Sequence, residues 1–151
     1  MLLPVTIYGY SWGKFLPPEQ IAGRHIPYER LHEHYGRAKI VLNDQWPDME
    51  REGLVPNRIF DVALSGGFVI SRDFRGSEFF GDDLVTYRAP EELGELCRKW
   101  LSSDAERKAT AERLRQRVLG SCTLSHRASE LLAVISELHK ARSESVHFLE
   151  Q

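Results

Sequence analysis

The chain has 151 residues, 42% of them apolar and 28% charged, with a formal net charge of −2. This composition is that of an average globular domain and excludes disordered and collagen-like proteins. The nearly balanced charge gives no strong attraction for nucleic acid. No apolar run approaches the roughly 20 residues that span a bilayer, and the stretch Met1–Tyr8 lacks the basic flank of a signal peptide, so we expect a cytoplasmic protein.

The first half of the chain alternates short apolar strands with helices. The predicted order is a strand over 3–8, an extended piece over 24–26, a helix over 27–37, a strand over 39–42, a helix over 56–65 and a strand over 67–70. Tyr28, Leu31 and Tyr35 recur at helical spacing. Gly66 and Gly67 are suited to end the helix that begins at Pro56.

The second half is predicted to be almost entirely helical. A short helix over 77–80 and an edge strand over 84–86 precede an amphipathic helix that begins at Pro90. A charged, mostly solvated helix is expected over 105–119. The last helix follows Ser125 and carries an apolar stripe formed by Ala128, Leu131, Leu132, Ile135 and Leu138.

These elements define the fold class. Short apolar strands without a period of two, alternating with helices, are typical of a parallel sheet covered on both faces. We therefore predict a three-layer, Rossmann-like α/β domain over residues 1–142 with a helix-rich C-terminus, and a frayed tail over 143–151.

Ligands of open parallel sheets bind beyond the carboxyl ends of the strands. Three predicted loops leave such ends, over 9–14, 43–57 and 71–76. The first has the pattern G-x-x-x-G, which fits neither the dinucleotide fingerprint nor a P-loop. It is interpreted either as a simple glycine turn or as a place where backbone approaches a phosphate.

The helix that begins near Pro56 carries the most informative pattern. A helix N-terminus offers unpaired N–H groups and a partial positive charge, which suit a diphosphate. Arg58 would add a guanidinium for phosphate oxygens, and Asp61, one turn later, could accept both hydroxyls of a ribose. The alternative is that the two side chains simply pair with each other along the helix.

Several stretches together resemble a known family. The segments KIVLNDQW, PNRIFDVALSGGFVIS, YRAPEEL and RVLGSCTLSHRASELL resemble the C-terminal domain of bacterial glycosyltransferases of the spore-maturation (CgeB-like) type. The chain is more distantly similar to the group 1 glycosyltransferases of the GT-B fold. The likeness extends from about Leu3 to Leu138.

The resemblance implies a donor-binding half of a two-domain enzyme. Such a half binds the nucleotide-sugar, and an N-terminal domain of the same protein binds the acceptor. Many group 1 members carry two glutamates eight positions apart; here Asp61 stands at the second position and Gly53 at the first, with Glu52 one residue away. This departure affects sugar recognition and the retaining chemistry of that group.

The resemblance also implies a mechanism in which the leaving diphosphate is stabilised by helix amides and an arginine. Arg58 is the first candidate, and Lys14 and Arg72 are further ones. A general base would come from the acceptor domain. The residues expected to bind the donor are Gly9, Ser11, Lys14, Asn57, Arg58, Asp61, Gly66, Gly67 and Arg72.

No metal or other cofactor is expected beyond the nucleotide-sugar substrate. His32 and His34 would point apart on a helix, and Asp82–Asp83 fits a turn better than a magnesium site. We expect the isolated chain to transfer no sugar and to self-associate weakly through an apolar face that its partner domain would cover.

Three other functions remain open on the sequence. The chain could be a nucleotide-sugar or nucleotide-binding module without catalysis, and the same Arg58 and Asp61 would then serve. A response-regulator-like domain would need an acidic pair after the first strand, where Gly9 and Tyr10 stand instead. A structural fragment that has lost ligand binding would explain Gly53.

Overall fold

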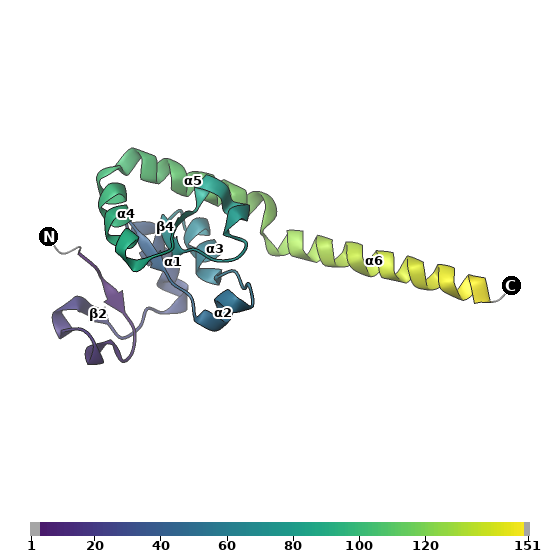
Figure 1. Cartoon of the computed structure of the whole chain (residues 1–151), viewed down its shortest axis with the longest axis horizontal. Coiled ribbons are helices and arrows are strands. Elements are labelled where there is room, and N and C mark those ends of the chain that lie inside the picture. The colour runs from purple at the N-terminus through teal and green to yellow at the C-terminus, as the bar shows by residue number, and fades with distance from the viewer. Residues whose placement is uncertain (1–3, 150–151) are drawn as a thin grey trace.

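The computed structural model describes residues 4–149, with side chains described for residues 4–140. It contains two parallel sheets (Figure 1). One pairs β1 (Ile7–Tyr8) with β2 (Ile21–Gly23), and the other has the strand order β3 (Val41–Asn43), β4 (Val69–Arg72), β5 (Val85–Tyr87). The α-helices are α1 (Tyr28–Arg37), α2 (Pro47–Arg51), α3 (Asn57–Leu64), α4 (Pro90–Ser102), α5 (Asp104–Ser121) and α6 (Leu124–Leu149). Short 3-10 helices η1 (Trp12–Lys14), η2 (Pro18–Gln20) and η3 (Ser77–Asp83) fill three of the loops.

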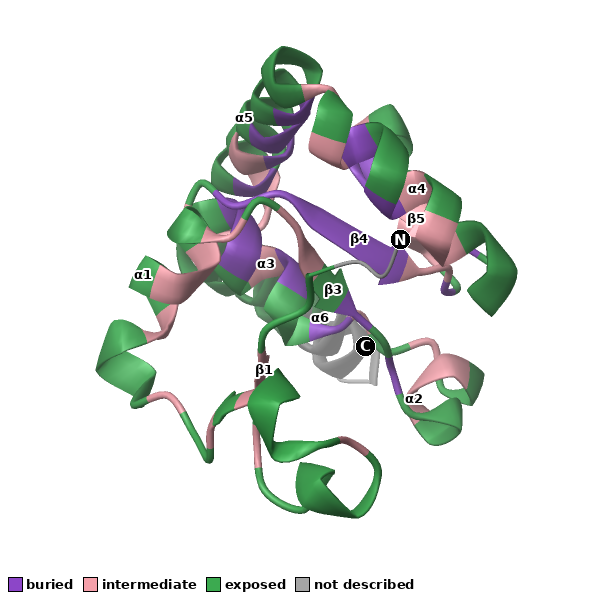
Figure 2. Cartoon of the chain, turned by 90° about the vertical axis from the view of Figure 1, so that its left-hand side faces the viewer, coloured by how far each residue is buried: buried purple, intermediate pink, exposed green. Residues whose placement is uncertain are grey.

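The central sheet is covered on both faces, which confirms the predicted three-layer α/β fold. Val69 of β4 packs into a cluster with residues of α3, η3 and α5, whereas its neighbours Phe68 and Ile70 pack with residues of α4. Figure 2 shows β4 buried along its length, with α3 on one side and α4 on the other. Successive side chains of a strand point to opposite faces, so an uninterrupted apolar strand fills both layers.

The first predicted strand does not join this sheet. β1 covers only Ile7–Tyr8 and pairs in parallel with β2, so these two strands form a separate ribbon. Gly23 of β2 lies against the Tyr8 ring, where an added Cβ would come within 3.2 Å of the ring. The short extended piece expected over 24–26 corresponds to β2, which lies a few residues earlier in the chain.

The end of α3 follows the glycine pattern predicted for it. Gly66 has φ +72°, its N–H donates to Ala63 O, and the N–H of Gly67 donates to Val62 O. This pair of bonds is a Schellman motif and satisfies the last carbonyls of the helix. A Cβ on Gly67 would lie 2.6 Å from Tyr35 O, so this glycine also lets α1 approach α3 closely.

The helix α5 buries one face against the core. Its buried residues are Arg107, Thr110, Ala111, Leu114 and Val118. They recur at helical spacing and place α5 against both apolar clusters. Most of the other residues over 105–119 are exposed, which confirms the prediction of a mostly solvated helix, but Arg107 and Thr110 occupy two positions on its buried face.

The last helix leaves the body of the domain (Figure 1). From Leu124 to Lys140, every side chain of α6 except that of His126 is exposed. The frayed tail expected over 143–151 stays a prediction. Residues 143–149 belong to α6, but their side chains are not described, and residues 150–151 lie outside the described residues. Within residues 4–149, none of the helices combines the length and apolar character needed to cross a bilayer.

Candidate functional site

The candidate site is the carboxyl edge of the β3–β4–β5 sheet. The three strands are parallel, so Asn43, Arg72 and Tyr87 end them on the same side. The helix α3 runs back between β3 and β4, so its N-terminus at Asn57 also lies on this side. In parallel α/β sheets this edge is where ligands bind.

A buried hydrogen bond holds the ends of β3 and β4 together. Asn43 Nδ2 donates to Ser71 Oγ at 2.9 Å, and Ser71 Oγ donates to Arg72 O at 2.8 Å. Asn43 and Ser71 are almost fully buried, so this contact is shielded from water. The sequence predicted Asn43 as a loop residue, but it belongs to β3 and fixes the edge.

Arg72 stands above this contact among acidic groups. Its guanidinium lies 3.9 Å from Asp44 Oδ1 and 3.6 Å from Glu50 Oε2. Both distances are long for an ion pair and all three side chains are partly exposed, so the pairs contribute little to stability. Arg72 is thus held loosely and could turn to an anion without breaking a strong contact.

Asp73 follows Arg72, and its carboxylate accepts hydrogen bonds from residues in the loops after β4 and β5. Ser77 Oγ donates to Asp73 Oδ1 at 2.7 Å, and Arg88 Nε donates to Asp73 Oδ2 at 2.9 Å. The hydrogen bond from Ser77 lowers the pKa of Asp73, and the contact with Arg88 lowers it further against the opposing effect of burial. This carboxylate therefore joins the ends of β4 and β5.

Tyr87 ends β5 and is nearly buried. Burial raises the pKa of its hydroxyl, and the nearby Asp44 carboxylate raises that pKa further. The phenol is therefore held in its neutral form at the carboxyl edge.

The start of α3 is open. Pro56 precedes the helix and no side chain caps it, so the first N–H groups have no side-chain acceptor. Asn57, Arg58 and Asp61 are all exposed. No ion pair joins Arg58 to Asp61, so the alternative in which they pair is not what the structure shows; no other described charge pairs with either side chain.

Two of the expected binding residues lie at the other end of this helix. Gly66 and Gly67 follow its C-terminus, and eight helical residues separate the two ends by about 12 Å. Their positions serve the Schellman motif and the contact with α1. The structure therefore does not bring them to the carboxyl edge.

The first expected loop lies in the ribbon of β1 and β2. The N–H of Gly9 donates to Gly23 O, and a Cβ at Gly9 would meet the Trp12 indole at 2.7 Å. Ser11 has φ +70°, and the N–H of Lys14 donates to Ser11 O. The G-x-x-x-G pattern therefore forms a glycine turn inside this ribbon, and an approach to phosphate there stays a prediction.

Gly53 occupies the position of the first expected carboxylate. Its φ of +68° belongs to the left-handed region, so it serves the turn after α2. The neighbouring Glu52 is exposed and pairs with Arg51 at 3.3 Å. Neither residue replaces the missing carboxylate at the start of α3.

The sequence did not single out Gln45, which also lies at this edge. Gln45, two residues beyond β3, is only 7% exposed, and neither of its side-chain polar atoms has a partner among the described residues. Its position after a strand end was the available signal. A polar residue in a loop is expected to be solvated, so its burial could not be read from the pattern.

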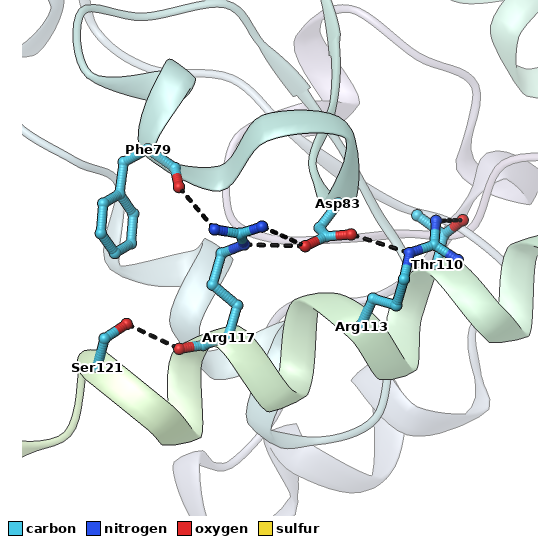
Figure 3. Close-up of polar contacts among 6 residues, drawn as sticks. All are labelled: Phe79, Asp83, Thr110, Arg113, Arg117 and Ser121. Carbon is cyan, nitrogen blue, oxygen red and sulfur yellow. Dashed lines mark hydrogen bonds and ion pairs between the residues drawn. The ribbon is translucent and has the colours of Figure 1, made fainter.

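A concave region lies away from this edge, along α5. Its volume is about 480 Å³, and Arg113, Gln116 and Arg117 line it. Figure 3 shows Asp83, just before β5, accepting hydrogen bonds from Arg113 and Arg117 at 2.9 Å each. Arg117 also donates to Phe79 O at 3.3 Å. These contacts tie η3 to α5 at the amino edge of the sheet.

Burial raises the pKa of Asp83, but the two arginines outweigh burial and lower its pKa overall. The role of the Asp83 carboxylate is therefore structural. Within the described residues, no three His, Cys, Asp or Glu side chains are grouped to hold a metal ion.

Comparison with known proteins gives one match. The model of a family described as "Glycosyl transferase-like" matches residues 2–133, which include both sheets and the whole carboxyl edge. No curated protein matches the chain, and no solved structure matches it. The match covers most of the chain, which therefore belongs to the glycosyl transferase-like family.

Proposed function

We propose that the chain is the donor-binding domain of a cytoplasmic glycosyltransferase of the GT-B type, of the CgeB-like branch. The observation that carries the proposal is the open N-terminus of α3, with Arg58 and Asp61 unpaired, at the carboxyl edge of a sheet in a glycosyl transferase-like chain. A nucleotide diphosphate offers groups that match all three.

In the proposed complex, the diphosphate lies at the first amides of α3, next to Asn57. The partial positive charge of the helix and the Arg58 guanidinium both attract it. Arg72 adds a second cation, since its pairs with Asp44 and Glu50 are long. Asp61, one turn into the helix, accepts hydrogen bonds from the ribose hydroxyls.

The same groups account for the proposed chemistry. Breaking the bond between sugar and phosphate leaves negative charge on the diphosphate. Amides and guanidinium groups that already face this position stabilise the charge without reorganising, which lowers the barrier. The proposal needs no metal ion, and a general base, if the reaction inverts, comes from the acceptor domain.

An N-terminal acceptor domain of the same protein is the proposed partner. Support comes from α6, which stands clear of the body (Figure 1). The leucines and the isoleucine of its apolar stripe are exposed. A stripe of this kind is normally covered. Without the acceptor domain, the chain has a donor site and no second substrate, so it should transfer no sugar.

A second function is a nucleotide-sugar or nucleotide-binding module without catalysis. Gly53 favours it, because a glycine with φ +68° replaces the first carboxylate and offers no side chain to a sugar. Binding would then be retained while the full-length protein shows no turnover.

Calorimetric titration of the chain with uridine, thymidine and guanosine diphosphates tests the proposal. We expect at least one of them to bind below millimolar concentration. If none of the three nucleoside diphosphates binds, the domain is not a donor site. Assay of the full-length protein then separates enzyme from binding module, and glycosylation of an acceptor by the 151-residue chain alone would contradict the proposed need for a partner.

A further inference from the structure

A buried amide without a hydrogen-bond partner lies at the carboxyl edge. Both Nε2 and Oε1 of Gln45 are buried and unpaired among the described residues. Among the described residues, the other buried side-chain atom without a partner is Trp100 Nε1, whose ring lies in the core against Phe68. Buried polar groups of folded proteins are nearly always paired, so the orphaned amide calls for a partner outside the chain.

Neighbouring groups are already committed to other bonds. The amide of Asn43 donates to Ser71, and the hydroxyl of Ser71 donates to Arg72 O. Asp44 Oδ1 accepts the backbone N–H of Gln45 itself. The side-chain amide of Gln45 therefore stays unpaired in a polar neighbourhood.

The segment that follows Gln45 is loosely attached. Residues 46–55 contain α2, and α2 has no buried residue. A single long ion pair, from Glu50 to Arg72 at 3.6 Å, joins α2 to β4 in the described structure. Segments with few buried contacts open at low free energy, so this segment can move while the sheet stays intact.

The residue after Gln45 adds a second ligand-binding feature. Trp46 is 77% exposed and immediately precedes α2. Nucleobases stack on exposed aromatic rings, and a carboxamide presents a donor and an acceptor side by side, as the edge of a base does. Consecutive residues thus offer the two contacts that a base requires.

We propose that Gln45 reads the nucleobase of the bound nucleotide and that Trp46 supplies the surface on which this base stacks. A diphosphate near Arg72 competes with Glu50 for the guanidinium, which frees the segment after Gln45 to move aside for the base. The inference rests on the proposed donor site and adds base recognition to it.

Two variants test the proposal. Gln45→Leu removes an unpaired amide, so it should keep or raise the urea midpoint of the free chain. It should weaken uridine and guanosine diphosphates about ten-fold, because hydrogen bonds to the base are lost, and leave inorganic pyrophosphate unchanged. Trp46→Ala, at an exposed position, should weaken the same two nucleotides and spare pyrophosphate. Gln116→Leu, an exposed glutamine of α5, is the matched control and should change neither ligand.

The outcomes separate the two proposals. If the wild type binds nucleoside diphosphates and both variants bind them equally well, base reading by this pair is wrong and the donor site stands. Equal weakening of pyrophosphate would also overturn it, because the effect would then not involve the base. If the wild type binds no nucleotide, both proposals fail.

Discussion

Apart from the buried, unpaired Gln45, the polar side chains at the carboxyl edge fall into those that hold it together and those that are open to solvent. Asn43, Ser71 and Asp73 belong to the first kind, since each bonds to a neighbouring strand or loop. Arg58 and Asp61 belong to the second. Substituting residues of the second kind should therefore change ligand binding and leave stability within about 0.5 kcal/mol.

Arg58→Ala should raise the dissociation constant of a nucleoside diphosphate about ten- to a hundredfold. A charged hydrogen bond contributes roughly 1.5–3 kcal/mol, and Arg58 has no described partner whose loss would unfold the helix. Calorimetry measures the constant, and thermal unfolding checks the fold. Arg127→Ala on α6 removes the same charge away from the edge and should leave the dissociation constant unchanged. Unchanged binding by Arg58→Ala would make this arginine a plain surface residue.

Asp61→Asn keeps the size of the side chain and removes its charge. If the carboxylate accepts both ribose hydroxyls, this variant should weaken uridine diphosphate more than pyrophosphate. It should also have a smaller effect on 2′-deoxyuridine diphosphate, which lacks one of the hydroxyls. Titration of the three ligands decides the matter, and equal losses for all three would exclude a role at the ribose.

The sequence was informative about residues whose role is local. The glycines that end α3 and the open start of that helix could be predicted, because caps depend on neighbours in the chain. That Gly66 and Gly67 lie at the edge opposite the site follows from the direction of α3. The burial of Gln45 depends on tertiary contacts, and no local pattern encodes those.

Among the elements, α5 has a charged residue on its buried face, which its sequence pattern does not predict. Arg107 is buried, yet its guanidinium donates to Trp100 O at 2.6 Å and contacts Asp104, so the charge is paired. Its long apolar stem covers the core beside Ala111. A pattern that counts arginine as solvated therefore misses one position of the buried face. The pairing of β1 with β2 was not predicted, because pairing partners of such short segments are set by tertiary contacts.

The contacts of Asp83 in η3 with Arg113 and Arg117 in α5 predict that the stability of the fold depends on pH. Asp83 is 13% exposed and its pKa lies below the usual 3.8, so ionisation stabilises the fold at neutral pH. This contribution is present above the unfolded-state pKa and is lost as pH falls through the lower folded-state pKa. Asp83→Asn should cost about 1–3 kcal/mol at pH 7, and the difference from wild type should shrink below pH of roughly 4.

Urea unfolding at pH 7, 4.5 and 3 measures this effect. The neighbouring Asp82 is exposed, so Asp82→Asn makes the same change in charge without altering the Asp83 ion pairs. It should change the free energy of unfolding by less than about 0.5 kcal/mol. Equal effects of the two variants would mean that net charge, and not the two arginine contacts in Figure 3, stabilises this region.

At the scale of the whole molecule, one apolar surface has no cover. Ala128, Leu131, Ile135 and Leu138 of α6 follow the alternating three- and four-residue spacing of a coiled-coil seam. Leu131 and Ile135 are 61% and 48% exposed. The sequence predicted this stripe and its helix correctly. That α6 extends away from the body could not be predicted, because amphipathic helices usually fold onto their own domain.

The exposed stripe of α6 should make the isolated chain self-associate. In the full-length protein the acceptor domain is proposed to cover the stripe, and in its absence the stripe of a second copy is the nearest apolar surface that matches it. Sedimentation velocity at increasing concentration should show a monomer–dimer equilibrium. Ile135→Glu should shift it to monomer, because a charge at the centre of the seam cannot be buried unpaired. Ala133→Glu places the same charge on the opposite side of α6 and should leave the dimer intact. A wild type that stays monomeric at the highest concentration, or equal disruption by both variants, would show that this stripe does not drive association.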